Sequence, residues 1–137
     1  MALSKIDADG VSGLQASITA TTTVPSEGGA VTTNLVQGLE KVWVNFIGTG
    51  TVAIRDSFNT SSITDVATGR YRPNYTNSFN YAADYAFHVT SGVLGATWGL
   101  QQLSTHTASS TEFILYNTSA GATDNSIVPC TARGDLA

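Results

Sequence analysis

Acidic residues and histidines are the side chains in this 137-residue chain that could carry catalytic chemistry. The ten acids are Asp7, Asp9, Glu27, Glu40, Asp56, Asp65, Asp84, Glu112, Asp124 and Asp135. Two carboxylates such as Asp56 and Asp65 could in principle act as the acid and base of a glycosidase. Most of the acids, however, stand in or beside predicted turns, where a carboxylate caps the backbone. We therefore interpret them as turn residues and predict no catalytic residue.

The two histidines, His88 and His106, are too few for a metal site within one chain, and there is no Cys/His set for zinc. Three copies of His88 could bind a metal on the axis of a trimer, but an ordinary hydrogen-bonded histidine explains the residue equally well. Asp84, His88 and Ser91 have the residue types of a catalytic triad, although closeness along one strand is not triad geometry. We predict no metal and no cofactor.

Several short motifs carry little weight. Asn59, Asn74 and Asn117 match the glycosylation pattern, which a chain rich in Ser and Thr produces by chance. Arg133-Gly134-Asp135 spells an adhesion tripeptide, and we interpret it as a coincidence. Cys130 follows a proline, and we interpret it as an inert, buried small residue rather than a nucleophile.

Aromatic residues are stronger candidates for a binding surface than the acids. We expect Phe79, Tyr85 and Phe87 in the core. Tyrosine or tryptophan on a loop or an edge strand can instead stack on a sugar ring or anchor a protein interface. The candidate surface contacts are Tyr71, Tyr75, Trp98, Gln101, Gln102 and His106.

Composition excludes several classes of protein. The chain contains 20 Thr, 14 Ser, 13 Gly and 8 Asn, only six Lys and Arg, and a net charge of −4. With so few basic residues, the sequence offers no positively charged patch for the phosphate backbone, so we do not expect a nucleic-acid-binding protein. Twelve aromatic residues argue against disorder. A surface of low charge can pack against copies of itself with little desolvation cost, which favours an assembly component over a freely diffusing enzyme.

The expected location follows from what the chain lacks. No apolar stretch approaches the roughly 20 residues of a membrane helix, so we predict no membrane insertion. Residues 1–7 lack the apolar region of a secretory signal, so we expect synthesis in a cytoplasm. A single cysteine excludes an internal disulfide.

Strand patterns dominate the chain, and they predict an all-β, antiparallel, jelly-roll-like β-sandwich. Residues 41–47 show the alternation of a strand, with Val42, Val44 and Phe46 on one face. The turn Gly48-Thr49-Gly50 then connects this strand to a second one over 51–55, as in a hairpin. A second hairpin joins 62–66 to 70–75, where Pro73 predicts an edge strand or a bulge. Further strands are predicted over 84–90 and 111–117 and from residue 126, with a long connection over 92–110.

Domain organisation follows from the uneven composition. Residues 1–40 are small, polar and rich in threonine, and they predict an extended N-terminal arm. Residues 41–137 contain the aromatic side chains and form the predicted sandwich domain. The apolar residues of the arm that we expect to dock it onto a partner are Leu3, Ile6, Val11, Leu14 and Ile18.

One segment, residues 31–76, resembles a known family. The residues that carry the resemblance are Thr32–Leu39, Lys41–Phe46, Gly48–Asn59, Ser61–Asp65, Thr68-Gly69 and Tyr71. Their order resembles the small β-sandwich domain of tail-fibre and other surface proteins of tailed bacteriophages, particularly marine ones. The chain departs from the family's pattern at Arg72–Tyr75. Near the C-terminus, Pro129 and Arg133 interrupt the usual last strand.

The resemblance implies a non-enzymatic component of the virion, displayed as a homotrimer on the particle surface. Its expected partners are capsid or tail proteins of the same particle and a glycan or protein of the host surface. A small trimeric fibre, or a domain like a tail-fibre tip, would attach the phage to its host. The alternative is a capsid decoration protein that stabilises the head shell. A glycan-cleaving enzyme is a third and more distant alternative, because a fold alone never excludes a site.

Overall fold

The computed structural model describes residues 23–25, 32–34, 39–91 and 100–137, and the chain divides into two units, Met1–Leu39 and Glu40–Ala137. In the first unit, β1 (Thr23–Pro25) pairs antiparallel with β2 (Thr32–Asn34). Every regular element in the described ranges is a strand, and none of these ranges contains a helix long and apolar enough to cross a membrane.

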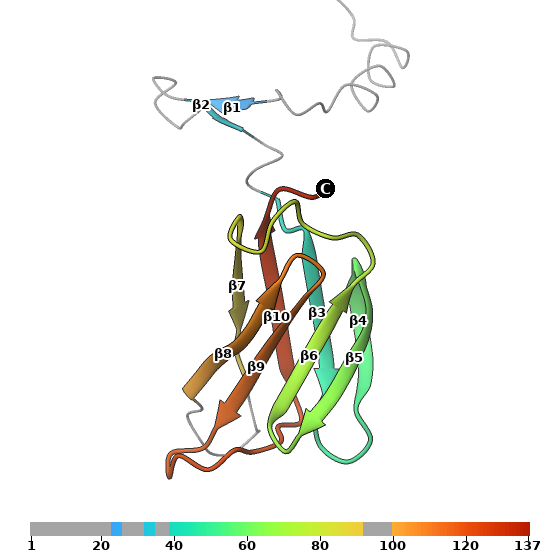
Figure 1. Ribbon diagram of the computed structural model, residues 1–137, viewed down its shortest axis with the longest axis vertical. Helices are drawn as coiled ribbons and strands as arrows, with labels where there is room; N and C mark the ends of the chain where they lie inside the picture. The colour runs from blue at the N-terminus through green and yellow to red at the C-terminus, as the bar shows by residue number, and fades with distance from the viewer. Residues whose placement is uncertain (1–22, 26–31, 35–38, 92–99) are drawn as a thin grey trace, which may run out of the picture. The chain divides into compact units, whose positions relative to one another are not determined.

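The second unit consists of two antiparallel sheets of four strands each, which face each other as a β-sandwich (Figure 1). Sheet I has the strand order β4-β3-β10-β7. Its strands are β3 (Val42–Ile47), β4 (Ala53–Phe58), β7 (Tyr85–Val89) and β10 (Val128–Gly134). The predicted all-β, antiparallel class is confirmed.

Sheet II has the strand order β5-β6-β9-β8. Its strands are β5 (Thr60–Ala67), β6 (Arg70–Tyr75), β8 (Leu100–Thr107) and β9 (Ser110–Tyr116). The pairs β3–β4, β5–β6 and β8–β9 are each hairpins within one sheet. Long-range pairs join these hairpins, because β10 pairs with β3 and with β7, and β9 pairs with β6.

The first predicted hairpin is confirmed in position and in orientation. β3 and β4 pair on either side of Gly48-Thr49-Gly50. Val42, Val44 and Phe46 are buried, whereas Trp43 between them is exposed. Strict alternation therefore identified the buried face correctly.

The second predicted hairpin, β5–β6, is also confirmed, but Pro73 does not mark an edge. β6 lies inside sheet II, between β5 and β9. Tyr71 and Asn74 have paired residues on β9, whereas the two residues between them have none. Because proline has no N–H to donate, the ladder with β9 is interrupted instead.

The long connection predicted over 92–110 is wrong for residues 100–107, which form β8. β8 is an edge strand whose one neighbour is β9. Its sequence, Leu-Gln-Gln-Leu-Ser-Thr-His-Thr, carries few apolar residues. An edge strand needs few apolar side chains, so the apolar–polar alternation by which we predicted the other strands is weak in residues 100–107.

The core between the sheets contains two clusters of buried side chains. The first is Val44, Phe46, Tyr71, Phe113, Leu115, Val128 and Cys130. The second is Val42, Tyr75, Phe79, Tyr85 and Ala132. The ring of Tyr71 lies edge-on to Phe46, with ring centroids 5.1 Å apart. Aromatic rings from both sheets therefore fill much of the interior, which binds the two layers together.

Cys130 on β10 provides a direct test of this packing. Burial raises the pKa of its thiol, so the reactive thiolate does not form at neutral pH. We expect a maleimide or a disulfide reagent to leave native protein unlabelled and to label it fully in denaturant. The variant Ser62→Cys, with its thiol on exposed β5, is the control and should react at once. Rapid labelling of Cys130 in native protein would contradict the buried position.

Candidate functional site

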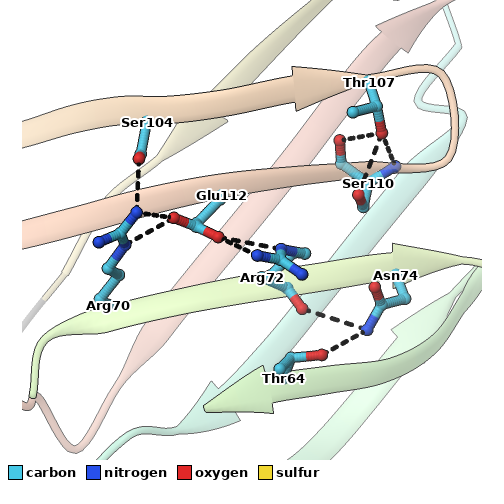
Figure 2. A network of polar contacts seen from close by, with 8 residues as sticks. All are labelled: Thr64, Arg70, Arg72, Asn74, Ser104, Thr107, Ser110 and Glu112. Atoms are coloured by element: carbon cyan, nitrogen blue, oxygen red, sulfur yellow. Dashed lines mark hydrogen bonds and ion pairs between the residues drawn. The ribbon is translucent and has the colours of Figure 1, made fainter. Parts of the chain in front are cut away.

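Glu112 is the most unusual charged residue of the described part, because its side chain lies on the outer face of a sheet and is only 2% exposed. Its neighbours on β9, Thr111 and Phe113, are buried as well. Arg70 and Arg72 on β6 close over the carboxylate from either side, as Figure 2 shows. The two arginines thus cover an acid that stands on the outer face of the sheet.

Hydrogen bonds satisfy both oxygens of this carboxylate. Arg70 Nε donates to Glu112 Oε1 at 2.5 Å, and Arg72 Nε donates to Oε2 at 3.0 Å. The Nη2 group of each arginine forms an ion pair with the same oxygen that its Nε contacts. Arg70 Nη2 also donates to Ser104 Oγ on β8 at 2.9 Å. Side chains of three adjacent strands are thereby connected.

The charge state of the cluster follows from these contacts. Hydrogen bonding from Arg72 lowers the pKa of Glu112, with further help from Arg70 and Ser104, and this outweighs the opposing effect of burial. The carboxylate therefore stays ionised and is a poor proton donor. Since Arg72 lies opposite Glu112 where Pro73 interrupts the ladder, the ion pairs connect β6 and β9 where backbone pairing is missing.

A second polar network lies inside the sandwich, around the Thr111 hydroxyl. Tyr75 and Tyr85 place their hydroxyls 2.7 and 2.6 Å from Thr111 Oγ1. His106 Nδ1 lies 3.2 Å from the same oxygen, and the His106 ring stacks on Tyr85 at 4.0 Å. Tyr85 also donates to the carbonyl of Thr107. Burial raises the pKa of Tyr75, so its hydroxyl stays protonated. The network connects Tyr85 of sheet I to Tyr75 and Thr111 of sheet II.

Two of the predicted surface contacts lie in the core, so their expected exposure is wrong. Tyr71 is 0% exposed and Tyr75 is 7% exposed. The Tyr71 hydroxyl lies 2.5 Å from Asp124 Oδ1 and 3.0 Å from the carbonyl of Gly48. We placed both tyrosines at the surface because Pro73 suggested an edge strand. In an inner strand, Tyr71, Pro73 and Tyr75 all face the core.

The other predicted contacts have mixed outcomes. Gln102 is exposed on β8 and accepts a hydrogen bond from the Tyr116 hydroxyl at 3.2 Å. His106 is half-buried against Tyr85 rather than fully exposed. Trp98 and the side chain of Gln101 lie outside the described residues, as do the predicted docking residues Leu3, Ile6, Val11, Leu14 and Ile18.

The residues considered for catalysis do not form a recognisable catalytic arrangement within the described residues. Asp56 and Asp65 lie on the neighbouring edge strands β4 and β5, where Asp56 is paired with Asn45 on the outer face of sheet I and Asp65 with the core residue Tyr71 of sheet II. Asp84 and His88 are exposed, and Ser91 Oγ has no hydrogen-bond partner within the described residues. No group of three His, Cys, Asp or Glu side chains in those residues is arranged to hold a metal ion.

The short motifs have structural explanations. Arg133, first residue of the adhesion tripeptide, lies in β10 and forms an ion pair with Glu40 at 2.6 Å. The amide nitrogen of Asn59, the first glycosylation match, donates to the carbonyls of Lys41 and Asn77. These two hydrogen bonds fix the Asn59 side chain at the turn between β4 and β5.

Sequence reasoning did not identify the most exposed strands of the sandwich, β4 and β5. Most of their side chains are exposed, including Ile54, Phe58 and Val66. Alternation alone does not reveal that a strand lies at a sheet edge, so the sequence did not indicate that these apolar residues are exposed.

Comparison of the chain with protein-family models, with curated proteins and with solved structures finds no match.

Proposed function

We propose that the chain is a structural subunit of a tailed-bacteriophage particle, displayed on the particle surface as a homotrimer. The observation that carries this proposal is the family resemblance of residues 31–76. Most of that segment folds as β3–β4 of sheet I and β5–β6 of sheet II. One hairpin from each layer is what a resemblance to a β-sandwich domain requires.

The surface of the second unit is compatible with such a role. Of the arginines in the described residues, Arg70, Arg72 and Arg133 are ion-paired with glutamates, which leaves a surface of few free charges. A polar surface rich in Ser and Thr can be packed against protein at low desolvation cost. Within this proposal, residues 1–40 attach the sandwich to the particle, and the sandwich acts as a small fibre that contacts a host glycan or protein.

A capsid decoration protein is the second candidate, and its support is the small sandwich of two four-stranded sheets with a polar surface. In this role the arm and the sandwich bridge neighbouring capsid subunits. The two candidates differ in copy number, because a tail carries few appendages whereas a head shell offers many equivalent sites.

Quantitative mass spectrometry of purified particles tests the proposal. We expect the chain in the particles, with copy number calibrated against the major capsid protein. A few copies per particle support the fibre, and hundreds support decoration. In the corresponding gene deletion, loss of adsorption to host cells indicates a fibre, whereas heads that rupture at lower temperature indicate decoration.

Two outcomes would contradict the proposal. One is absence of the chain from purified particles although it is present in infected cells. The other is hydrolysis of host polysaccharide by the purified chain that is abolished by Asp56→Asn or Asp65→Asn, which would favour the glycan-cleaving enzyme.

A further inference from the structure

β4 and β5 form one lateral side of the sandwich. β4 is the outermost strand of sheet I, and β5 is the outermost strand of sheet II. Only Asn59 separates them in the chain, in a left-handed conformation with φ of 56°. Figure 1 shows the two strands side by side, and they contact each other. We call the surface formed by Ala53–Phe58 and Thr60–Ala67 the β4–β5 edge.

Exposed apolar side chains are concentrated on this edge. Phe58 is 53% exposed and lies opposite exposed Trp43 on β3. Ile54 and Val66, on β4 and β5, are also large exposed apolar residues. Within residues 40–91 and 102–137, the other large apolar side chains with this exposure are Tyr81 and Leu103. Trp43 and Phe58 are cross-strand neighbours on the outer face of sheet I, whereas Ile54 lies opposite buried Phe46 and so points to the other side of the sheet. The exposed pair of Trp43 and Phe58 is therefore the apolar surface of the kind that marks an interface.

Charges on the edge are of both signs. Arg55 on β4 is the one Lys or Arg side chain in the described residues without an ion pair, hydrogen bond or other contact. Asp56 and Asp65 are exposed on the same edge. Because the edge carries Arg55 as well as two carboxylates, the arginine of one copy can pair with a carboxylate of another copy.

Each of the two strands has a neighbour within its sheet on one side only. Both strands carry charged side chains and both hairpins have register shifts, features that oppose the addition of a further strand. The edge therefore offers a partner its side chains, and their mixed charge fits a protein better than a ligand of one charge sign.

We propose that the β4–β5 edge, with Trp43, is the surface through which copies of this chain associate. The occupant is a second copy, because Arg55 of one chain finds a complementary carboxylate, Asp56 or Asp65, on the same edge of the next. Phe58 and its cross-strand neighbour Trp43 are buried on association. The inference rests on the proposed function, since it assigns the subunit interface of the proposed trimer.

Sedimentation analysis of the full chain tests this interface. We expect wild-type protein to associate reversibly, and Phe58→Asp to raise the dissociation constant tenfold or more, as for a buried aromatic anchor. The matched control is Leu103→Asp, which places the same charge at a similarly exposed apolar residue on the opposite edge strand, β8. It should change the dissociation constant less than twofold. Added salt should weaken wild-type association, and Arg55→Gln should reduce that salt dependence.

Hydrogen exchange provides a second measurement that needs no variant. Wild-type chain is compared at protein concentrations above and below its dissociation constant. We expect the amides of β4 and β5 to exchange more slowly at the higher concentration, while those of β8 do not change. This measurement decides the question if Phe58→Asp fails to fold.

The inference is overturned if wild-type protein stays monomeric, or if it associates while exchange at β4 and β5 is independent of concentration. Its failure can be distinguished from failure of the proposed function. Absence of the chain from particles would contradict that function and leave the interface intact. An oligomer held together elsewhere would contradict the interface and leave the function intact.

Discussion

The double variant R70L/R72L is expected to lower the free energy of unfolding by about 3 kcal/mol at pH 7, because the Glu112 carboxylate loses the charge-assisted hydrogen bonds from both arginines. Glu112 is 2% exposed, and both arginines lie against it. E112Q should cost less, about 2 kcal/mol, since the two guanidinium groups are more than one-third exposed and water can solvate them again. Urea denaturation gives both values.

Two further variants complete this experiment. The triple variant R70L/R72L/E112L removes all three charges, and we expect its stability to be close to that of the wild type. R133Q breaks the more exposed ion pair with Glu40 and should cost less than about 1 kcal/mol. If R70L/R72L were as stable as the wild type, Glu112 would not depend on the arginines.

The dependence on pH has a defined sign. Arg72 and Arg70 lower the pKa of Glu112 in the folded protein, whereas in the unfolded chain it is about 4.3. The stability from this shift is complete above about pH 4.3 and is lost as the pH falls through the folded-state pKa. E112Q should lack this loss. In R70L/R72L, burial without a cation raises the pKa of Glu112, so its deficit relative to wild type should shrink as the pH falls.

A larger contrast is expected between two glycine substitutions that are matched in backbone conformation. Gly50 and Gly69 both lie in hairpin turns with φ of +68°, a conformation that costs a residue with Cβ about 1 kcal/mol. A Cβ added at Gly50 would have no atom within 4 Å, so G50A should cost only that amount. At Gly69 the same Cβ would lie 2.5 Å from the backbone nitrogen of Thr123 and 2.8 Å from the carbonyl of Leu115.

G69A is therefore expected to cost about 3 kcal/mol or more, because backbone atoms have to move. The displacement would also disturb Asp124, whose Oδ1 accepts hydrogen bonds from the Gly69 amide and the Tyr71 hydroxyl. Denaturation of both variants under identical conditions measures the difference. Equal costs for G50A and G69A would show that residues 121–124 do not pack against the β5–β6 turn.

The sequence predicted hairpins well, because hairpins are local. Alternation over Val42–Ile47 and the glycines that follow determine both a strand pair and its buried face within about 15 residues. The same holds for β7, where Tyr85 is buried and Ala86 and His88 are exposed. No information from distant parts of the chain is needed for such elements.

Strand order, in contrast, depends on distant contacts. Pro73 predicted an edge strand or a bulge, yet β9, some 40 residues further along, pairs on the other side of β6, and Tyr71 and Tyr75 are core residues. The burial of Glu112 likewise requires Arg70 and Arg72 from another strand. Neither feature leaves a periodic signal in its own segment.

The all-β class and the hairpins follow from local patterns in the amino-acid sequence. Which strands are edges, and therefore why Ile54, Phe58 and Val66 are exposed while Tyr71 is buried, became clear from the packing of distant strands. The physical reason is that alternation specifies which side chains share a face, whereas exposure depends on whether another strand or sheet covers that face.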